Sequence, residues 1–248
     1  MEEKTLLQTV TENAVFVVQF IALVVALVLL AYVIEKAVKK SEGNTERVLS
    51  TRKLAVCGMF AALAAVLMVL EFPVPYAPSF YGMDFSELPA LIGAFAYGPV
   101  AGVLIEFCKV FIKILFKPTS TAFVGELANF VVGCSFLLPA SVIYLFRRTR
   151  KGAVIGSVTG TLCMAFFGAV FNAIYLLPKF SQLFGMPLDA IVGMGTAVNP
   201  AINSVTTLVI FAVAPHNLIK GGLVSLITML IYKKISPIIK EGTKKRGR

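Results

Sequence analysis

Seven apolar runs, separated by short polar connections, determine what this chain can fold into. They lie near residues 13–34, 54–70, 88–105, 106–116, 122–146, 152–178 and 216–232. A helix of about 20 apolar residues crosses the hydrocarbon layer of a bilayer. The mean hydropathy is +0.86 and only 15% of the residues are charged, against about 25% in soluble domains. The chain is therefore predicted to be an all-α integral membrane protein with no room for an additional soluble domain.

The first apolar run is expected to be an additional N-terminal transmembrane helix that precedes a bundle of six. It is too long for the apolar part of a signal peptide, and acidic residues precede it where such a peptide carries basic ones. Within the bundle, Gly98 and Pro99 predict a tight hairpin between the second and third helices, because glycine permits a turn and proline removes a helical donor.

Basic residues gather in three connections that alternate along the chain. Seventeen of the 23 lysines and arginines lie in residues 36–53, 147–151 and 233–248. Such clusters mark the cytoplasmic side of a membrane protein. The connections 71–87 and 178–189, which together contain only one lysine, are expected outside. This topology accounts for the net charge of +10 without nucleic-acid binding, and it places the C-terminus in the cytosol.

The connection from Asp189 to Pro215 is long for a membrane bundle and largely apolar. We expect a short helix or re-entrant segment packed against the outer face, where it can act as a lid. The alternative is a further spanning helix, which would reverse the side of the C-terminus. Basic residues at both ends of the last two helices argue against that alternative.

Lys220 is the single charge between Ala190 and Tyr232. An ammonium in hydrocarbon costs several kcal/mol or more, so such a residue persists where it faces a bundle interior, a partner or a ligand. Asn217 lies three residues before it. The sequence therefore predicts a binding site around Lys220. The alternative is that Lys220 extends to the headgroups from near a helix end.

Other polar groups come from different helices at a similar depth, namely Asp84, Glu126, Asn129 and Asn172. Together with Lys220 they can converge on one cavity that opens outward and binds a small molecule. Each has a structural alternative. Asp84 can cap a helix, and Asn172 can bond to a neighbouring helix.

Enzymatic chemistry finds no support in the sequence. Phosphate-binding loops, zinc-protease motifs and paired carboxylate motifs are absent. His216 is the single histidine, which excludes a multi-histidine metal centre, and its position after a proline is typical of a structural residue. The four cysteines stand singly in apolar segments, without the spacing of a metal site or a disulfide framework. Glu106 and Lys109 are expected to form an internal ion pair.

The segment CGMFAALAAV in the first bundle helix contains small residues at four-residue spacing. The pairs are Gly58 with Ala62 and Ala61 with Ala65. Small side chains at this spacing let a second helix approach closely. They favour contact with a partner, although packing inside the bundle explains the same pattern.

The chain resembles the riboflavin-specific substrate-binding (S) component of the energy-coupling factor (ECF) vitamin transporters. The resemblance covers about residues 53–235. It is carried by DFSELPALIGAFAYGPVAGVLIE, GELANFVVG with the following LLPASVIY, RKGAVIG, NAIYLLP and APHNLIKGGLVSLIT. The small-residue pattern of the first bundle helix is shared across S components for different vitamins.

The resemblance implies a six-helix bundle without enzymatic activity or a cofactor. Such a bundle captures riboflavin outside and docks on a membrane coupling subunit that bears two ATPases. The residues that match flavin contacts are Asn172, Asn217 and Lys220. Asp84 lies beside the pocket and can accept from ribityl hydroxyls, while Phe80 and Tyr81 can stack on the ring or cover it.

The expected organisation has three parts in the cell membrane. They are an extra helix and basic cytosolic linker, a vitamin-binding membrane domain, and a basic cytosolic tail, at residues 1–52, 53–235 and 236–248. The resemblance supplies no role for the first part. The alternatives are an S component for another vitamin, a membrane enzyme acting on a lipid or isoprenoid, and a helical scaffold.

Overall fold

Helices form wherever the apolar runs predict them. The structure is a computed structural model that describes residues 8, 11–43, 47–78, 80–119 and 121–244. The elements are α2 (Ala14–Ser41), α3 (Thr51–Val69), β1 (Phe72–Pro73), β2 (Gly82–Met83), α4 (Glu87–Tyr97), α5 (Pro99–Phe116), α6 (Val124–Phe146), α7 (Arg150–Phe171), the π-helical turn η1 (Asn172–Leu176), α8 (Leu177–Phe184), α9 (Leu188–Thr196), α10 (Val205–Leu208), the π-helical turn η2 (Val209–Val213) and α11 (Ala214–Lys244).

Five helical stretches in the described chain are long and apolar enough to cross a membrane. They are residues 14–41, 51–69, 124–146, 150–184 and 205–231. The prediction of an all-α membrane protein is confirmed. Helix α4 is shorter, and α5 carries three charged residues within 18 residues. The predicted tail is helical as far as Lys244, and its last four residues lie outside the described part.

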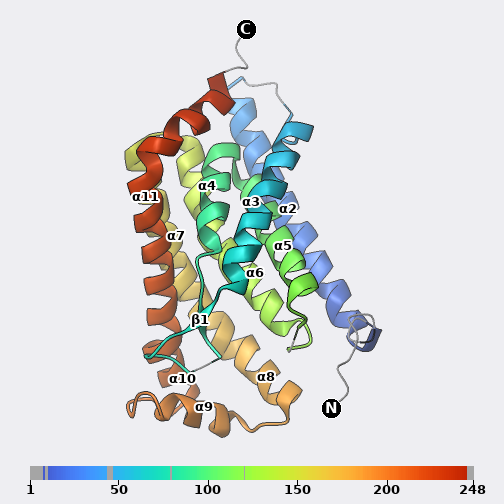
Figure 1. Cartoon of the computed structure of the whole chain (residues 1–248), viewed down its shortest axis with the longest axis vertical. Coiled ribbons are helices and arrows are strands. Elements are labelled where there is room, and N and C mark those ends of the chain that lie inside the picture. Colours follow the sequence, from blue (N-terminus) through green and yellow to red (C-terminus); the bar gives the residue numbers. More distant parts are fainter. Residues whose placement is uncertain (1–7, 9–10, 44–46, 79, 120, 245–248) are drawn as a thin grey trace.

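The bundle surrounds the short helix α4, which contacts α3, α5, α6 and α11. Ala90 and Leu91 of α4 are fully buried in the apolar core. Figure 1 shows the two ends of the bundle: the strands, α8 and α9 lie at one end, and the C-terminal end of α11 lies at the other. The paired strands, with Phe72 opposite Met83, therefore belong to the end that the charge pattern predicts to be external.

The hairpin predicted between α4 and α5 is present, and Gly98 is the turn. Its φ of 94° is in the region that favours glycine, and Pro99 occupies the first turn of α5, where no donor is needed. The apolar runs 88–105 and 106–116 therefore form two helices that meet at residue 98 and not at residue 105. The turn residues determine this helix boundary, and hydropathy does not.

Two prolines do not end the helices in which they lie. The sequence predicts that a helix ends where the connection 178–189 begins, at Pro178, but the helix continues from Arg150 to Phe184. A π-helical turn lies just before Pro178 and another just before Pro215. The wider turn changes the bonding of the carbonyls that a proline ring would otherwise strike. Such turns are frequent at functional sites, and Asn172 is the first residue of η1.

The long connection after Asp189 contains the short helix α9. A short helix was the first of the two predictions for this connection, and a further spanning helix was the alternative. The last spanning helix begins at Val205, where Ser204 and Thr207 form a capping box. A further complete span in residues 189–204 is excluded, since α9 has only nine residues. The role of this segment as a lid stays a prediction.

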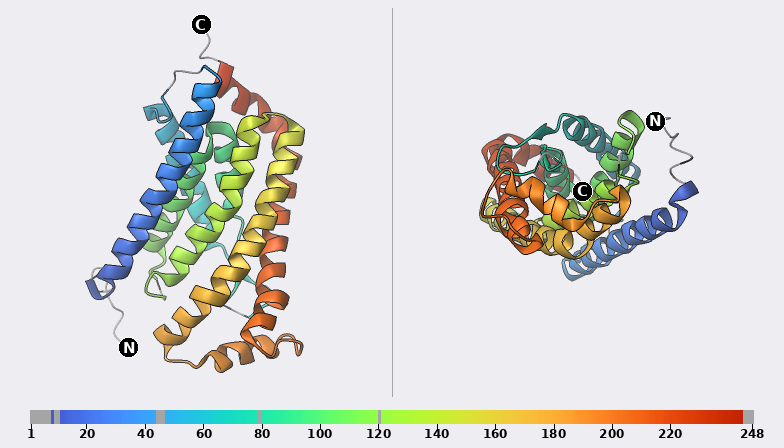
Figure 2. Two further views of the ribbon diagram at one scale, coloured as in Figure 1. Left: turned by 180° about the vertical axis from the view of Figure 1, so that it is seen from behind. Right: turned by 90° about the horizontal axis from the view of Figure 1, so that it is seen from below.

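Helix α2 packs along the outside of the bundle against α5 and α6 (Figure 2). Phe20 and Phe130 have ring centroids 5.7 Å apart. Near its C-terminal end, α2 also carries Glu35, which is almost fully buried. One oxygen of Glu35 lies 2.9 Å from Lys53 Nζ, and the other accepts from the backbone N–H of Val100 at 3.3 Å. Glu35 thus joins α2 to α3 and to the start of α5.

Replacing Glu35 with alanine is expected to lower the midpoint of thermal unfolding in detergent by several degrees. The change leaves the buried Lys53 ammonium without a carboxylate, and breaking a buried ion pair costs roughly 3 kcal/mol or more. The matched control is Glu42→Ala. Glu42 is exposed and 3.8 Å from Arg148, so its loss should have no measurable effect. An equal midpoint for both variants would contradict this role of Glu35.

Candidate ligand-binding site

A cavity of about 910 Å³ lies within the end of the bundle that carries the strands. Its wall comes from the 71–87 connection and from α3, α4, α5, α6, α7, η1, α8, α9, η2 and α11. The volume falls in the range of about 300 to 1,000 Å³ that is common for small-molecule sites.

All six residues predicted to bind the ligand line this cavity, although they come from three parts of the chain, the 71–87 connection, η1 and α11. They are Phe80, Tyr81, Asp84, Asn172, Asn217 and Lys220. The geometry brings them together, and their contact with a ligand stays a prediction.

Asn172 and Asn217 differ in the hydrogen bonds that their side chains already make. Asn172 donates to the carbonyl of Gly168 at 2.8 Å and accepts from the Tyr81 hydroxyl at 2.9 Å. Burial raises the pKa of Tyr81, which keeps its hydroxyl a donor. The side chain of Asn217 has no hydrogen bond to any described residue. A Cβ at Gly168 would lie 2.4 Å from Asn217 Nδ2, so a larger residue there would displace the Asn217 amide.

Lys220 is buried inside the bundle and paired with acids, which excludes its extension to the headgroups. Its ammonium donates to Asp84 Oδ2 at 2.9 Å and lies 3.0 Å from Glu87 Oε2. The other oxygen of Asp84 accepts from the backbone N–H of Ser86. Burial alone would raise the pKa of Asp84, but the charges of Lys220 and Lys109 outweigh it and lower this pKa to about 2. Asp84 is therefore ionised.

The predicted pair of Glu106 with Lys109 is present, at 2.8 Å, and it belongs to the same charge network. Lys109 also lies 3.0 Å from Glu87 Oε1 and donates to Ser86 Oγ at 2.8 Å. Both members of the predicted pair are fully buried. Three carboxylates and two ammonium groups thus join the connection before α4 to α4, α5 and α11.

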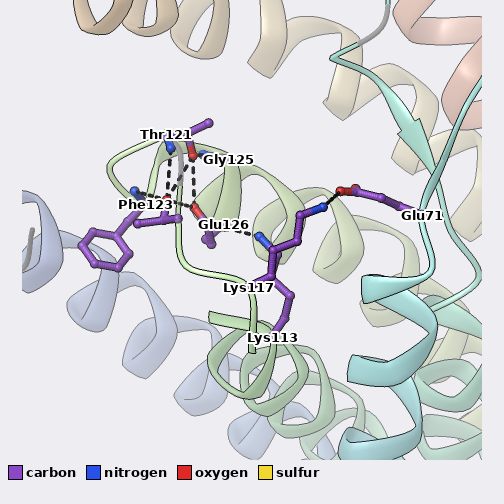
Figure 3. A network of polar contacts seen from close by, with 8 residues as sticks. Glu71, Lys113, Lys117, Thr121, Phe123, Gly125 and Glu126 are labelled. Carbon is purple, nitrogen blue, oxygen red and sulfur yellow. Dashed lines mark hydrogen bonds and ion pairs between the residues drawn. The ribbon is translucent and has the colours of Figure 1, made fainter. Parts of the chain in front are cut away.

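A second group of polar contacts lies in the cavity wall where α5 ends and α6 begins (Figure 3). Glu126 lies 2.9 Å from Lys113 Nζ and accepts from the hydroxyls of Thr119 and Thr121. Glu126 was expected as one of the polar groups available at the cavity, but these three partners already occupy it. Lys117 pairs with Glu71 and joins α5 to the residue before β1.

Two further groups lie in the cavity wall: Asn129, which the sequence placed among the polar groups of this cavity, and His216, which it assigned only a structural role. His216 is buried, its ring lies 6.1 Å from that of Tyr81, and its Nδ1 has no partner among the described residues. Asn129 Oδ1 is likewise buried without a described partner. Both atoms can bond to a ligand. The position of His216 directly before Asn217 was the available signal.

Comparison with known proteins identifies the family. Residues 52–232 match the substrate-specific component of ECF transporters. The chain belongs to this family. Helix α2 lies outside the matched residues. The S-component family consists of parts of transporters, which removes the membrane enzyme from the alternatives.

The similar proteins match this chain over almost their whole length. The riboflavin transporter RibU of Staphylococcus aureus (strain TCH60) is 31% identical over 189 residues, which are 76% of this chain and 93% of that protein. The riboflavin transporter FmnP of Bacillus subtilis (strain 168) is 29% identical over 194 residues, 78% and 96% of the two chains. A solved S component of a bacterial ECF transporter matches with a TM-score of 0.58 and 31% identity, over 76% of this chain and 98% of that one.

The small residues predicted to contact a partner of the S component do not form one surface. Gly58 and Ala62 are exposed on α3, whereas Ala61 and Ala65 are buried in the bundle. The prediction for Ala61 and Ala65 is therefore corrected, because their stripe faces the core. Contact of Gly58 and Ala62 with a coupling subunit stays a prediction.

Proposed function

We propose that this chain is the riboflavin-binding subunit of an ATP-driven importer in the cell membrane. It captures riboflavin from outside and delivers it through a membrane coupling subunit and two ATPases. The observation that carries the proposal is a single cavity that combines Asn172, Asn217 and Lys220 with aromatic rings, in a family whose similar members include riboflavin transporters.

The chemistry of the cavity suits an isoalloxazine ring. This ring has two apolar faces and an edge of alternating acceptors and an N–H donor. An asparagine amide matches such an edge because it supplies both a donor and an acceptor. Asn217 is available for this contact, and Lys220 can donate to a ring carbonyl or nitrogen. Phe80 and Tyr81, with ring centroids 4.5 Å apart, supply aromatic surface for stacking.

The polyol chain of riboflavin calls for acceptors and donors beside the ring. Asp84 lines the cavity as an ionised carboxylate and can accept from hydroxyls. Asn129 and His216 offer the polar atoms without partners described above. The same scaffold can carry another vitamin, so an S component of different specificity remains the second candidate. The asparagine amides beside Lys220 favour riboflavin over another vitamin as the ligand.

The test begins with the absorption spectrum of the protein purified from cells, in which a retained flavin is expected to be visible. Riboflavin binding is then titrated by quenching of flavin fluorescence, with thiamine and biotin as competitors. Lys220→Met and Asn217→Ala should each weaken binding about tenfold or more, since an unpaired ligand group costs roughly 1 to 3 kcal/mol.

Two matched controls separate the site from general damage. Lys151→Met and Asn203→Ala change exposed residues outside the cavity and should leave the affinity unchanged. Wild-type affinity in well-folded Lys220→Met and Asn217→Ala proteins would refute the site. Displacement of the flavin by thiamine or biotin would favour the second candidate.

A further inference from the structure

Glu87 touches both lysines of the buried charge network. It lies in the first turn of α4 and is 1% exposed. Its Oε1 is 3.0 Å from Lys109 Nζ, and its Oε2 is 3.0 Å from Lys220 Nζ. One carboxylate therefore links a lysine at the cavity wall to a lysine in the core.

The core end of this link is fixed by packing. Lys109 is fully buried and also contacts Ser86 and Glu106. Glu106 in turn lies against the backbone of α6, where a Cβ on Gly133 would come within 2.3 Å of Glu106 Oε2. Interiors packed this closely do not deform continuously. Lys109 and Glu106 thus hold Glu87 from the side opposite to the cavity.

The second acid beside Lys220 is placed differently. Asp84 lies in the connection between β2 and α4, outside the spanning helices, and it faces the cavity. If Asp84 accepts from ligand hydroxyls, as proposed above, it has less capacity left for Lys220. Glu87 lines the cavity as well, but Lys109 holds its Oε1 from the core.

The ammonium of Lys220 keeps a donor for the ligand in this arrangement. An ammonium has three N–H donors. One is given to Asp84, and Glu87 Oε2 lies 3.0 Å from the same nitrogen. With one donor directed to each of these two acids, the third is left for the ligand.

From these contacts we infer that Glu87 is a positioning residue for Lys220: it holds the ammonium at the cavity wall while Lys220 and Asp84 contact the ligand. The inference rests on the proposed function, because it concerns how that site presents its lysine. Glu87 lines the cavity too, and the role inferred for it acts through Lys220.

A double-mutant cycle tests whether Glu87 acts through Lys220. Riboflavin dissociation constants are measured for the full-length wild type, Glu87→Gln, Lys220→Met and the double variant, all checked for folding by thermal unfolding. Glu87→Gln is expected to weaken binding about fivefold or more in the wild-type background, as coupled neighbours do. In the Lys220→Met background the same change should have almost no effect. Lys220→Gln replaces Lys220→Met if the latter does not fold.

The control is Glu126→Gln, which changes another buried acid at the cavity, paired with Lys113. Any effect of it should be equal in both backgrounds, since the two sites share no partner. Equal losses for Glu87→Gln in both backgrounds would show a merely structural role and overturn the inference. So would unchanged affinity of Glu87→Gln or of Lys220→Met, even though wild-type riboflavin binding would still support the proposed function. Absence of riboflavin binding by the wild type would remove both.

Discussion

Replacing Lys109 with methionine is expected to prevent stable folding of the bundle. Lys109 is fully buried and holds the carboxylates of Glu87 and Glu106. Glu106 has no other close ion pair among the described residues, so the change leaves a buried charge uncompensated. Breaking such a pair costs roughly 3 to 5 kcal/mol, a large part of the roughly 5 to 15 kcal/mol that stabilises a typical protein. The yield of monodisperse protein and its thermal unfolding in detergent measure the effect.

A second substitution separates the loss of charge balance from the loss of side-chain volume. Adding Glu106→Leu to Lys109→Met removes the orphaned acid, and buried ion pairs replaced by apolar residues are often near neutral in stability. The double variant should therefore recover much of the lost stability. The control Lys113→Met should be milder, because Glu126 keeps the hydroxyls of Thr119 and Thr121. Wild-type stability of Lys109→Met alone would contradict this role of the network.

The spans and their boundaries could be predicted from the sequence only as far as local chemistry decides them. Hydropathy found the helices, and the hairpin was predicted by Gly98 and Pro99, not by the boundary between apolar runs at residue 105. Pro178 misled the prediction, since a proline locally favours a helix end. The helix that contains Pro178 continues because the π-helical turn η1 precedes this proline. No sequence pattern around Asn172 predicts such a turn.

The members of the site were predictable, but their pairing was not. Motifs placed six residues that do line one cavity. The partner of Lys220 is Asp84, 136 residues away in the chain, and spacing cannot reveal contacts over that distance. Glu87 was missed for the same reason, because its two lysines lie on other helices. By contrast, Glu106 with Lys109 is a pair at i and i+3, which helical geometry alone predicts.

Spacing also left open which stripe of α3 faces outward. Gly58 with Ala62 and Ala61 with Ala65 have the same four-residue spacing, and only the packing of α4 and α5 against α3 distinguishes the two pairs. The neighbours of Ala61 in the core include Ala90 and Leu91. A Cβ at Gly58, however, meets nothing within 4 Å. The exposed pair is therefore the one that can admit a partner helix.

Tryptophan at Gly58 or Ala62 is expected to reduce riboflavin uptake by cells that depend on this chain to near background, while the isolated protein binds riboflavin normally. The new side chain points away from the bundle and the cavity, but it prevents close approach of another helix, which small residues permit. Ala61→Trp should instead destabilise the bundle itself, since that site is fully buried. Val18→Trp, on the exposed face of α2, should leave both uptake and binding intact. Normal uptake by the Gly58 and Ala62 variants would exclude this stripe as the docking surface for a coupling subunit, and loss of binding would place it in the fold of the cavity.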